Sequence, residues 1–343
     1  MKKKGFVSLL AVALLTVTML SGCAAPAAKG SAGNAAAAKK EDPKYPTKPI
    51  DYVVSFGAGG GNDIIARAVA EYLSKEWGQP INVVNKAGAG GAIGVNEALK
   101  HSKPDGYTVL GTSVTNTSTL LAGTVTLPFT IADFQFVSKV VEDPLAFIVK
   151  EDAPWKDFKE FSDWAKNNTD QLTYATPGPS GIATFAISEW LDLIGADFSK
   201  ARMITTVGAS ESMPKIAGGH ITVGVLSVSE AATMVKAGKA KMLAVVSGKR
   251  SQYFPDVPTA DESGIKMTVK WWTGVAVPVG TPDSIVKKWD EAIAKMSKDP
   301  AFLEKLKSIN AESSYLSTAE VTKMVKEETE KYVEVATKKG LRK

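Results

Sequence analysis

Residues 53–73 read VVSFGAGGGNDIIARAVAEYL, in which a short apolar run meets a cluster of glycines and a helical pattern follows at once. Within the helical part, Ile65, Val69 and Leu73 recur every four residues, which places them on one apolar face of a helix. Glycine has no Cβ, so it lets a backbone turn tightly and lets another group come close. The stretch therefore predicts a strand, a turn and a helix, with something held against the turn.

The same order of strand, glycines and helix recurs along the chain in two series. The first series covers 50–78, 81–102 and 107–113, and the second covers 170–191, 201–219, 220–238 and 240–248. Short strands that alternate with helices indicate parallel-type sheets with helical crossovers. We therefore expect an α/β protein with two sheets flanked by helices.

Two long extended segments join these series. One lies at 134–155 and is broken at Pro144, and the other lies at 267–282. Two helices, 283–298 and 319–339, close the chain and can return to the first unit. This order predicts two lobes, with a cleft between them and a β-strand hinge in each extended segment. Ligands of open α/β sheets bind at the carboxyl ends of strands, where the glycine clusters lie here.

The lobe boundaries follow from the two extended segments. We expect one lobe at 45–143 plus 271–343 and the other at 144–270. Trp271 and Trp272 stand at the second boundary and could serve as stacking platforms for a ligand. Adjacent strand residues point to opposite faces, so at most one of them can line the cleft, and packing in the core is the favoured role for the pair.

The N-terminus indicates the compartment. Lysines at positions 2–4 precede an apolar run at 6–20, which is shorter than the roughly 20 residues of a membrane-spanning helix. The run ends in LSGC, where Cys23 is the only cysteine of the chain. This pattern predicts a lipoprotein signal peptide at 1–22, with an ordinary signal and an incidental cysteine as the alternative. We expect a lipid on Cys23, a flexible tether at 23–44 and a location on the outer face of the cytoplasmic membrane.

Charge and motifs exclude several classes of function. Removal of the three signal-peptide lysines leaves 38 Lys and Arg against 36 Asp and Glu, a net charge of +2, without the basic excess of a nucleic-acid binder. Neither glycine cluster completes a P-loop or a dinucleotide fingerprint. His101 and His220 lack the spacing of a zinc site, and no G-x-S-x-G elbow is present. We expect no enzyme activity, no cofactor and no metal, with a hydrolase kept as the third class to test.

Capture of an anion by backbone amides remains. Glycine turns that open helices leave unpaired N–H groups, and the helix N-terminus adds a partial positive charge. Together they can hold a carboxylate without a lysine or arginine. The alternative is that the glycines at 57–61, 88–91 and 178–181 only allow close packing of strand and helix. Three clusters at predicted strand ends favour the binding site.

A family resemblance covers residues 45 to about 335. The segments YPTKPIDYVVSFGAGGGNDIIAR, GQPINVVNKAGAGGAIG, KPDGYTVLGTS, AGGHITVGVLSVSEA, GKAKMLAVVSGKRSQYFPDVPTADESG and WWTGVAVPVGTP occur in this order. The ordered set resembles the substrate-binding proteins of tripartite tricarboxylate transporters, the TctC or Bug family. This resemblance implies a type II periplasmic-binding-protein fold that closes on a small carboxylate, as a monomer, and delivers it to a permease of one large and one small membrane subunit.

The resemblance also implies a set of ligand-binding residues. In the first lobe they are Phe56, Gly57, Ala58, Gly60, Asn62, Asp63, Gly88, Ala89, Gly90, Gly91, Ser113 and Thr115. In the second lobe they are Thr176, Gly178, Ser180, Thr206, Val207, Gly208 and Ser227.

This chain departs from the family pattern at several of these places. Gly57 and Ala58 stand where prolines are usual, and residues 205–208 read TTVG where the family has Pro-Tyr-Lys-Gly. Phe185 stands where a histidine is frequent. We therefore expect a less polar, uncharged second-lobe wall and a ligand with one carboxylate and a neutral or aromatic remainder. A sensor that presents its closed form to a membrane receptor is the alternative to a transporter subunit.

Overall fold

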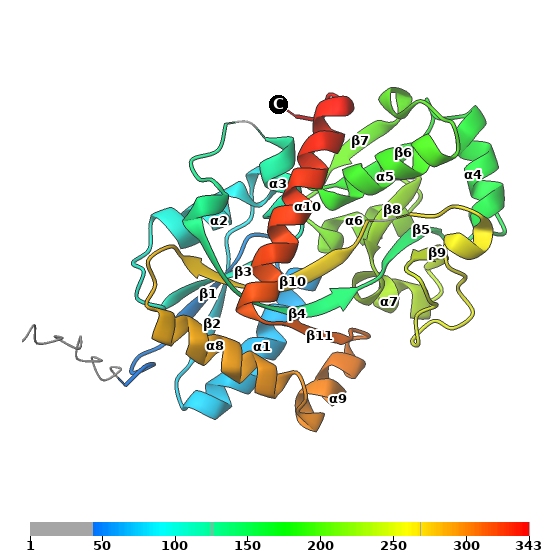
Figure 1. Ribbon diagram of the computed structural model, residues 1–343. Helices are drawn as coiled ribbons and strands as arrows, with labels where there is room; N and C mark the ends of the chain where they lie inside the picture. Colours follow the sequence, from blue (N-terminus) through cyan, green and yellow to red (C-terminus); the bar gives the residue numbers. More distant parts are fainter. Residues whose placement is uncertain (1–43, 125, 268, 343) are drawn as a thin grey trace, which may run out of the picture. The chain divides into compact units, whose positions relative to one another are not determined.

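The computed structural model describes residues 44–124, 126–267 and 269–342 (Figure 1). The predicted signal peptide, the lipid site at Cys23 and nearly all of the predicted tether lie outside the described residues. Among the described residues, no helix is both long and apolar enough to cross a membrane. The folded part has two β-sheets with helices packed against them, as the alternation of strands and helices predicts.

The first sheet has the strand order β11-β4-β10-β3-β1-β2. Its strands are β1 (Ile50–Val54), β2 (Ile81–Asn85), β3 (Thr108–Ser113), β4 (Phe134–Asp143), β10 (Trp271–Pro278) and β11 (Ser313–Leu316). The helices that accompany them along the chain are α1 (Gly61–Trp77), α2 (Ala92–Lys100), α3 (Ser118–Gly123), α8 (Asp283–Met296), α9 (Pro300–Ser308) and α10 (Thr318–Lys338).

The second sheet has the strand order β7-β6-β8-β5-β9. Its strands are β5 (Leu145–Lys150), β6 (Thr173–Thr176), β7 (Arg202–Thr205), β8 (Val223–Ser227) and β9 (Ala240–Val246). The helices between them are α4 (Phe158–Asn167), α5 (Ile182–Leu193), α6 (Ala209–Ala217) and α7 (Val228–Lys236).

Both sheets are mixed rather than wholly parallel. β1 pairs in parallel with β2 and β3, and β6 pairs in parallel with β7 and β8. β10 is antiparallel to β3 and β4, and β5 is antiparallel to β8 and β9. The strands of the strand–helix series are thus parallel, as predicted. β5 and β10 each follow a segment that connects the two sheets, and they run antiparallel to the strands of these series.

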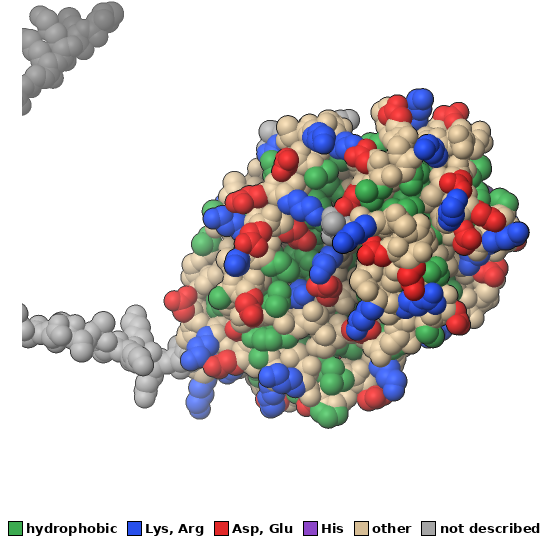
Figure 2. All heavy atoms as spheres, turned by 45° about the vertical axis from the view of Figure 1, so that its right-hand side comes forward, with side chains coloured by type: hydrophobic (Ala, Val, Ile, Leu, Met, Phe, Trp, Pro, Cys, Tyr) green, Lys and Arg blue, Asp and Glu red, His purple; other side chains and the backbone are tan. Residues whose placement is uncertain are grey.

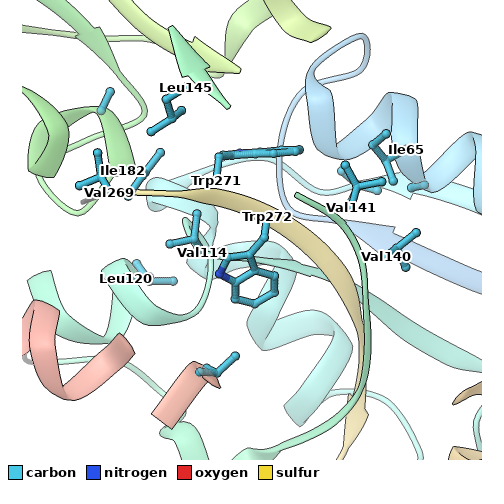
Figure 3. Close-up of a cluster of buried hydrophobic side chains, with 14 of the residues drawn as sticks. Ile65, Val114, Leu120, Val140, Val141, Leu145, Ile182, Val269, Trp271 and Trp272 are labelled. Atoms are coloured by element: carbon cyan, nitrogen blue, oxygen red, sulfur yellow. The ribbon is translucent and has the colours of Figure 1, made fainter. Parts of the chain in front are cut away.

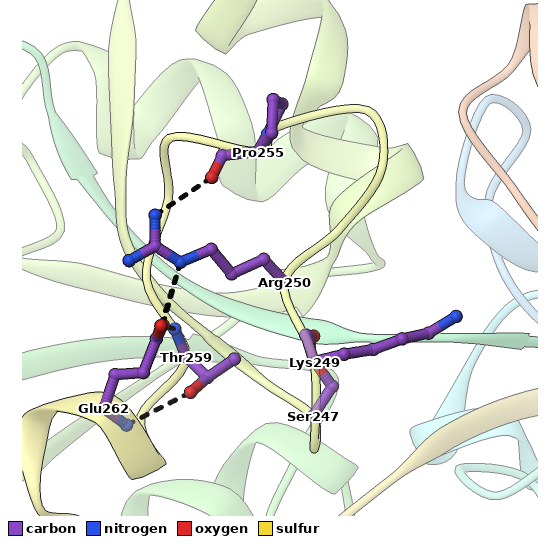
Figure 4. A network of polar contacts seen from close by, with 6 residues as sticks. All are labelled: Ser247, Lys249, Arg250, Pro255, Thr259 and Glu262. Carbon is purple, nitrogen blue, oxygen red and sulfur yellow. Dashed lines mark hydrogen bonds and ion pairs between the residues drawn. The ribbon is translucent and has the colours of Figure 1, made fainter.

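Two segments connect the sheets. β4 ends at Asp143 in the first sheet, and β5 begins at Leu145 in the second, so the single residue Pro144 separates them. The return path, described at 247–267 and 269–270, is a long loop with one short 3-10 helix at Asp261–Ser263, and β10 begins only at Trp271. Arg250 holds this loop together, because its Nε donates to Glu262 at 3.0 Å and its guanidinium also reaches the carbonyl of Pro255 (Figure 4). Thr259 and Glu262 complete the network through two further bonds.

Helix α10 packs against both halves of the fold. It lies beside α3 and crosses in front of β10 (Figure 1). The Tyr332 ring of α10 meets the Phe185 ring of α5, with centroids 4.9 Å apart. Lys339, just beyond the helix, forms an ion pair with Asp192 of α5. Phe185 is therefore a fully buried packing residue. It contributes nothing to the polarity of a cleft wall, contrary to our expectation from the sequence.

Candidate functional site

A cavity of about 50 Å³ lies between the carboxyl ends of the two parallel strand sets. Its wall combines residues of both sheets and of the helices that follow their strands. The lining residues are Phe56, Gly60, Gly61, Asn62, Thr115, Leu145, Ala175, Thr176, Pro177, Ile182, Ala183, Gly208, Ala209, Ser212, Val225, Leu226, Glu230 and Trp271. This is the place that α/β topology assigns to a ligand.

The first wall of the cavity is the N-terminus of α1. Gly59 has a φ of +79°, which favours glycine, and Gly60 precedes the helix in an extended conformation. The amides of Gly61, Asn62 and Asp63 belong to the first helical turn and have no acceptor within the helix. Of these three amides, only that of Gly61 donates a hydrogen bond to another of the described residues. The turn therefore presents free donors and the positive end of the helix dipole.

Asp63 orders this turn instead of facing the cavity. Its carboxylate accepts from the Gly59 amide at 2.9 Å, from Arg67 Nε at 2.9 Å and from Asn85 Nδ2 at 3.0 Å. Burial alone would raise the pKa of Asp63, but these hydrogen bonds and the Arg67 charge outweigh burial and lower it. Asp63 is thus an ionised structural group of the β1–α1 turn.

Glu230 of α7 is the ionisable residue among the described residues of the wall, and it was not predicted from the sequence. Its Oε1 accepts from the Gly61 amide at 2.8 Å, and its Oε2 accepts from the Ser227 amide at 3.1 Å. Burial raises the pKa of Glu230, although the bonds from Gly61 and Ser227 oppose that rise. The sequence signal was Ser-Val-Ser-Glu at 227–230, which reads as a helix capping box and so as a structural motif.

Asn62 brings an unsatisfied polar group to the same wall. It is 8% exposed, and its Oδ1 is buried without a hydrogen-bond partner among the described residues. Buried polar atoms are almost always paired in folded proteins. Asn62 and the nearby Thr115 therefore offer neutral hydrogen-bonding groups to an occupant of the cavity.

The remaining wall is mostly apolar, with hydroxyl groups at Thr176 and Ser212, and apart from Glu230 it is uncharged. Among the described residues that line the cavity there is no lysine, arginine or histidine. Trp271 lies on the cavity side of β10, and Trp272 points to the opposite side, where its Nε1 donates to Glu328 at 3.0 Å (Figure 3). The expectation that at most one of these tryptophans can line the cleft is confirmed.

The predicted ligand-binding residues fall into two groups. Those that line the cavity are Phe56, Gly60, Asn62, Thr115, Thr176 and Gly208. Those that lie outside its wall are Gly57, Ala58, Asp63, Gly88, Ala89, Gly90, Gly91, Ser113, Gly178, Ser180, Thr206, Val207 and Ser227. A ligand role for either group remains a prediction.

Several residues of the second group have structural partners instead. The glycine turn at 88–91 packs beside the first turn, because a Cβ on Gly91 would lie 3.2 Å from the Phe56 ring. Ser227 caps α7, and Ser113 donates its amide to Asn116 at 2.7 Å. The hydroxyl groups of Thr206 and Ser212 are hydrogen-bonded to each other at 3.0 Å.

The outer charges show no bias toward one sign. Figure 2 displays a face on which Lys and Arg side chains alternate with Asp and Glu. Several ion pairs of the described residues are exposed i,i+4 pairs on helices, such as Lys159 with Asp163. Within the described residues there is no cluster of His, Cys, Asp and Glu that could hold a metal ion.

Comparisons with known proteins agree with this geometry. The tripartite tricarboxylate transporter family receptor matches residues 65–341. The "UPF0065 protein in gbd 5'region" of Cupriavidus necator is 32% identical over 327 residues, 93% of this chain and 95% of that protein.

Two solved structures share the fold over most of this chain. The periplasmic binding protein BugD has a TM-score of 0.80 and 29% identity, covering 87% of this chain and 99% of its own. MatC of Rhodopseudomonas palustris, solved with bound malate, has a TM-score of 0.78 and 25% identity, covering 85% of this chain and 100% of its own. BugD is named as a periplasmic binding protein, and a further similar structure as a periplasmic transporter. The chain belongs to the tripartite tricarboxylate transporter receptor family, which includes the Bug proteins.

Proposed function

We propose that this receptor captures a small organic acid with one carboxylate and a neutral, apolar or aromatic remainder. The observation that carries the proposal is the cavity between the two sheets, which joins free amides of α1 to a largely apolar wall without a lysine, arginine or histidine among its described residues. Helix N-termini with free amides are suited to anions. Phe56, Leu145 and Trp271 are suited to an apolar remainder.

Capture involves a closure of two lobes, which we propose to be 45–143 plus 271–343 and 144–270. Three contacts already bridge these lobes around the cavity. The Gly57 amide meets the Val207 carbonyl at 3.4 Å, the Gly61 amide meets Glu230, and Thr124 Oγ1 meets Ser180 Oγ at 3.2 Å. The described arrangement thus has the features of a closed state. Opening about Pro144 and the 247–270 loop would admit the solute.

Delivery is proposed to follow the family pattern. The receptor would pass its solute to the large and small permease subunits, while a lipid on Cys23 holds it at the outer face of the cytoplasmic membrane. Support comes from the matching receptor family and from the single cysteine at the end of the apolar N-terminal run. The malate bound to MatC supports an organic acid as the solute class.

A thermal-shift screen of the purified chain against a panel of mono-, di- and tricarboxylic acids tests this function. A solute that binds only the folded state raises the melting temperature by mass action. We expect a rise of several degrees with a monocarboxylate, and smaller shifts with citrate.

Two variants locate the binding. Gly60→Leu should abolish the rise, because it places a side chain into the cavity. Gly248→Leu is the matched control and should keep the rise, since a Cβ there meets nothing within 4 Å. If no acid shifts the melting temperature of the folded chain, the proposed function is wrong.

A further inference from the structure

We propose that Glu230 is a specificity-determining residue that restricts the cavity to solutes with a single carboxylate. This inference rests on the proposed function and names the residue that sets its solute class.

The position of the Glu230 carboxylate is the first observation. The residue belongs to α7 beside the second sheet, yet its Oε1 lies 2.8 Å from the Gly61 amide at the N-terminus of α1. A Cβ on Gly61 would approach the Glu230 Oε1 to 3.0 Å, so glycine is what allows this approach. Glu230 therefore occupies one of the amides at the N-terminus of α1, a place suited to an anion.

Helix capping alone does not explain this contact. The capping box of α7 uses Oε2, which accepts from the Ser227 amide at 3.1 Å. A capping glutamate needs one oxygen, and the second oxygen here reaches the opposite lobe. The half-buried side chain thus borders the cavity with a negative charge that its capping role does not require.

The charges around the cavity are the second observation. Among the described lining residues Glu230 is the one ionisable side chain. A further titratable group that interacts with Glu230 is Asp143 at the end of β4, which accepts from the Ser229 amide at 3.0 Å and is also an acid. No lysine, arginine or histidine of the described wall is present to offset an added negative charge.

One carboxylate can still enter. The amides of Asn62 and Asp63 remain as donors, and Glu230 can share a proton with a solute carboxylate, as paired carboxyl groups do. A second carboxylate finds only neutral groups such as Asn62 and Thr115, and two like charges in a site of low dielectric repel strongly. The cavity therefore favours a solute with one negative charge over a solute with two.

Isothermal titration of the purified full chain with matched acids tests this inference. The probe pairs are hexanoate with adipate and benzoate with terephthalate, each pair equal in length or ring but different in charge. We expect the wild type to favour the monocarboxylate of a pair by about 10-fold or more. Glu230→Gln keeps an oxygen for the Gly61 amide and removes the charge. It should narrow the preference by about 10-fold through tighter binding of the dicarboxylate.

Glu211→Gln is the matched control. Glu211 lies on α6 of the same lobe and binds the Val207 amide, but it does not line the cavity. This variant should keep the wild-type preference, and circular dichroism should show that all three chains are folded. An unchanged preference in Glu230→Gln overturns the inference, and so does an equal change in Glu211→Gln. If none of the four acids binds any of the chains, the proposed function itself fails.

Discussion

The backbone amide of Gly57 donates to the carbonyl oxygen of Val207 across 3.4 Å, which joins the turn after β1 to the turn after β7. These turns belong to different sheets, and 149 residues of chain that separate them pass through the β4–β5 crossover. If the lobes close as proposed, contacts of this kind form only in the closed state. They allow the closure to be tested apart from the stability of either lobe.

A wedge at Gly123 should hold the lobes apart. A Cβ on this residue of α3 would lie 2.7 Å from the Ser180 Cβ and 3.0 Å from the Ser180 Cα in the other lobe. Gly123→Val should therefore weaken acid binding by more than about 10-fold, because closure is prevented. Small-angle scattering should show that acid contracts the wild type and not the variant.

Gly248→Val serves as the comparison for the wedge. A Cβ at Gly248 meets nothing within 4 Å, so this variant should contract and bind like the wild type. Normal contraction of Gly123→Val in the presence of acid would show that closure does not bring α3 onto Ser180.

The two adjacent tryptophans should differ in what they control. Trp272→Phe removes the N–H that bonds to Glu328, so it should lower the free energy of unfolding by about 1–2 kcal/mol with little effect on affinity. Trp271→Phe changes the cavity wall, so it should weaken acid binding several-fold. Chemical denaturation and titration of both variants measure the two effects. Equal effects of both variants on affinity would contradict this division.

Asp143 should make stability depend on pH. Burial, with the nearby charge of Glu230, raises the pKa of Asp143 from 3.8 to about 7. Between these values the folded chain holds a proton that the unfolded chain has lost, so the free energy of unfolding falls as pH rises through this window.

Asp143→Asn isolates this contribution. The variant keeps an oxygen for the Ser229 amide and cannot ionise. Below about pH 4 the ionisation of Asp143 should make no difference between the wild type and the variant in the free energy of unfolding. By pH 7 the variant should be more stable, by roughly 4 kcal/mol at most. Melting curves of both chains across this range measure the difference. A difference that does not change with pH would exclude a buried, ionising Asp143.

Solute binding should take up a proton at Glu230. Burial already raises the pKa of this carboxyl above 4.5, and a neighbouring solute carboxylate raises it further. The bound chain then carries more protons than the free chain, so affinity for a monocarboxylate should fall as pH rises above the ordinary glutamate range. Titrations in two buffers with different ionisation enthalpies count the protons. The wild type should take up more protons than Glu230→Gln.

Several features of this protein could be predicted from local sequence. Apolar runs followed by glycines and helical periodicity specified both strand–helix series, the break at Pro144 and the two long C-terminal helices. The ordered motifs identified the family, and the family match confirms that resemblance. Helices α3, α4 and α9 and strand β11 were not predicted, and for α3 and β11 the reason is that six and four residues carry too little periodic signal. The direction of the crossover strands was not predicted either, because pairing depends on which distant strand lies beside them.

The sequence by itself determined which segments fold into two sheets, where the glycine turns stand and that the chain is a receptor of this family. Only the tertiary structure decided what those turns meet. Glu230 stands 169 residues from Gly61, and its motif in the sequence describes nothing beyond the cap of its own helix. The physical reason is that backbone propensities and apolar periodicity act over a few residues. The charge inside a cavity depends instead on side chains that distant segments bring together.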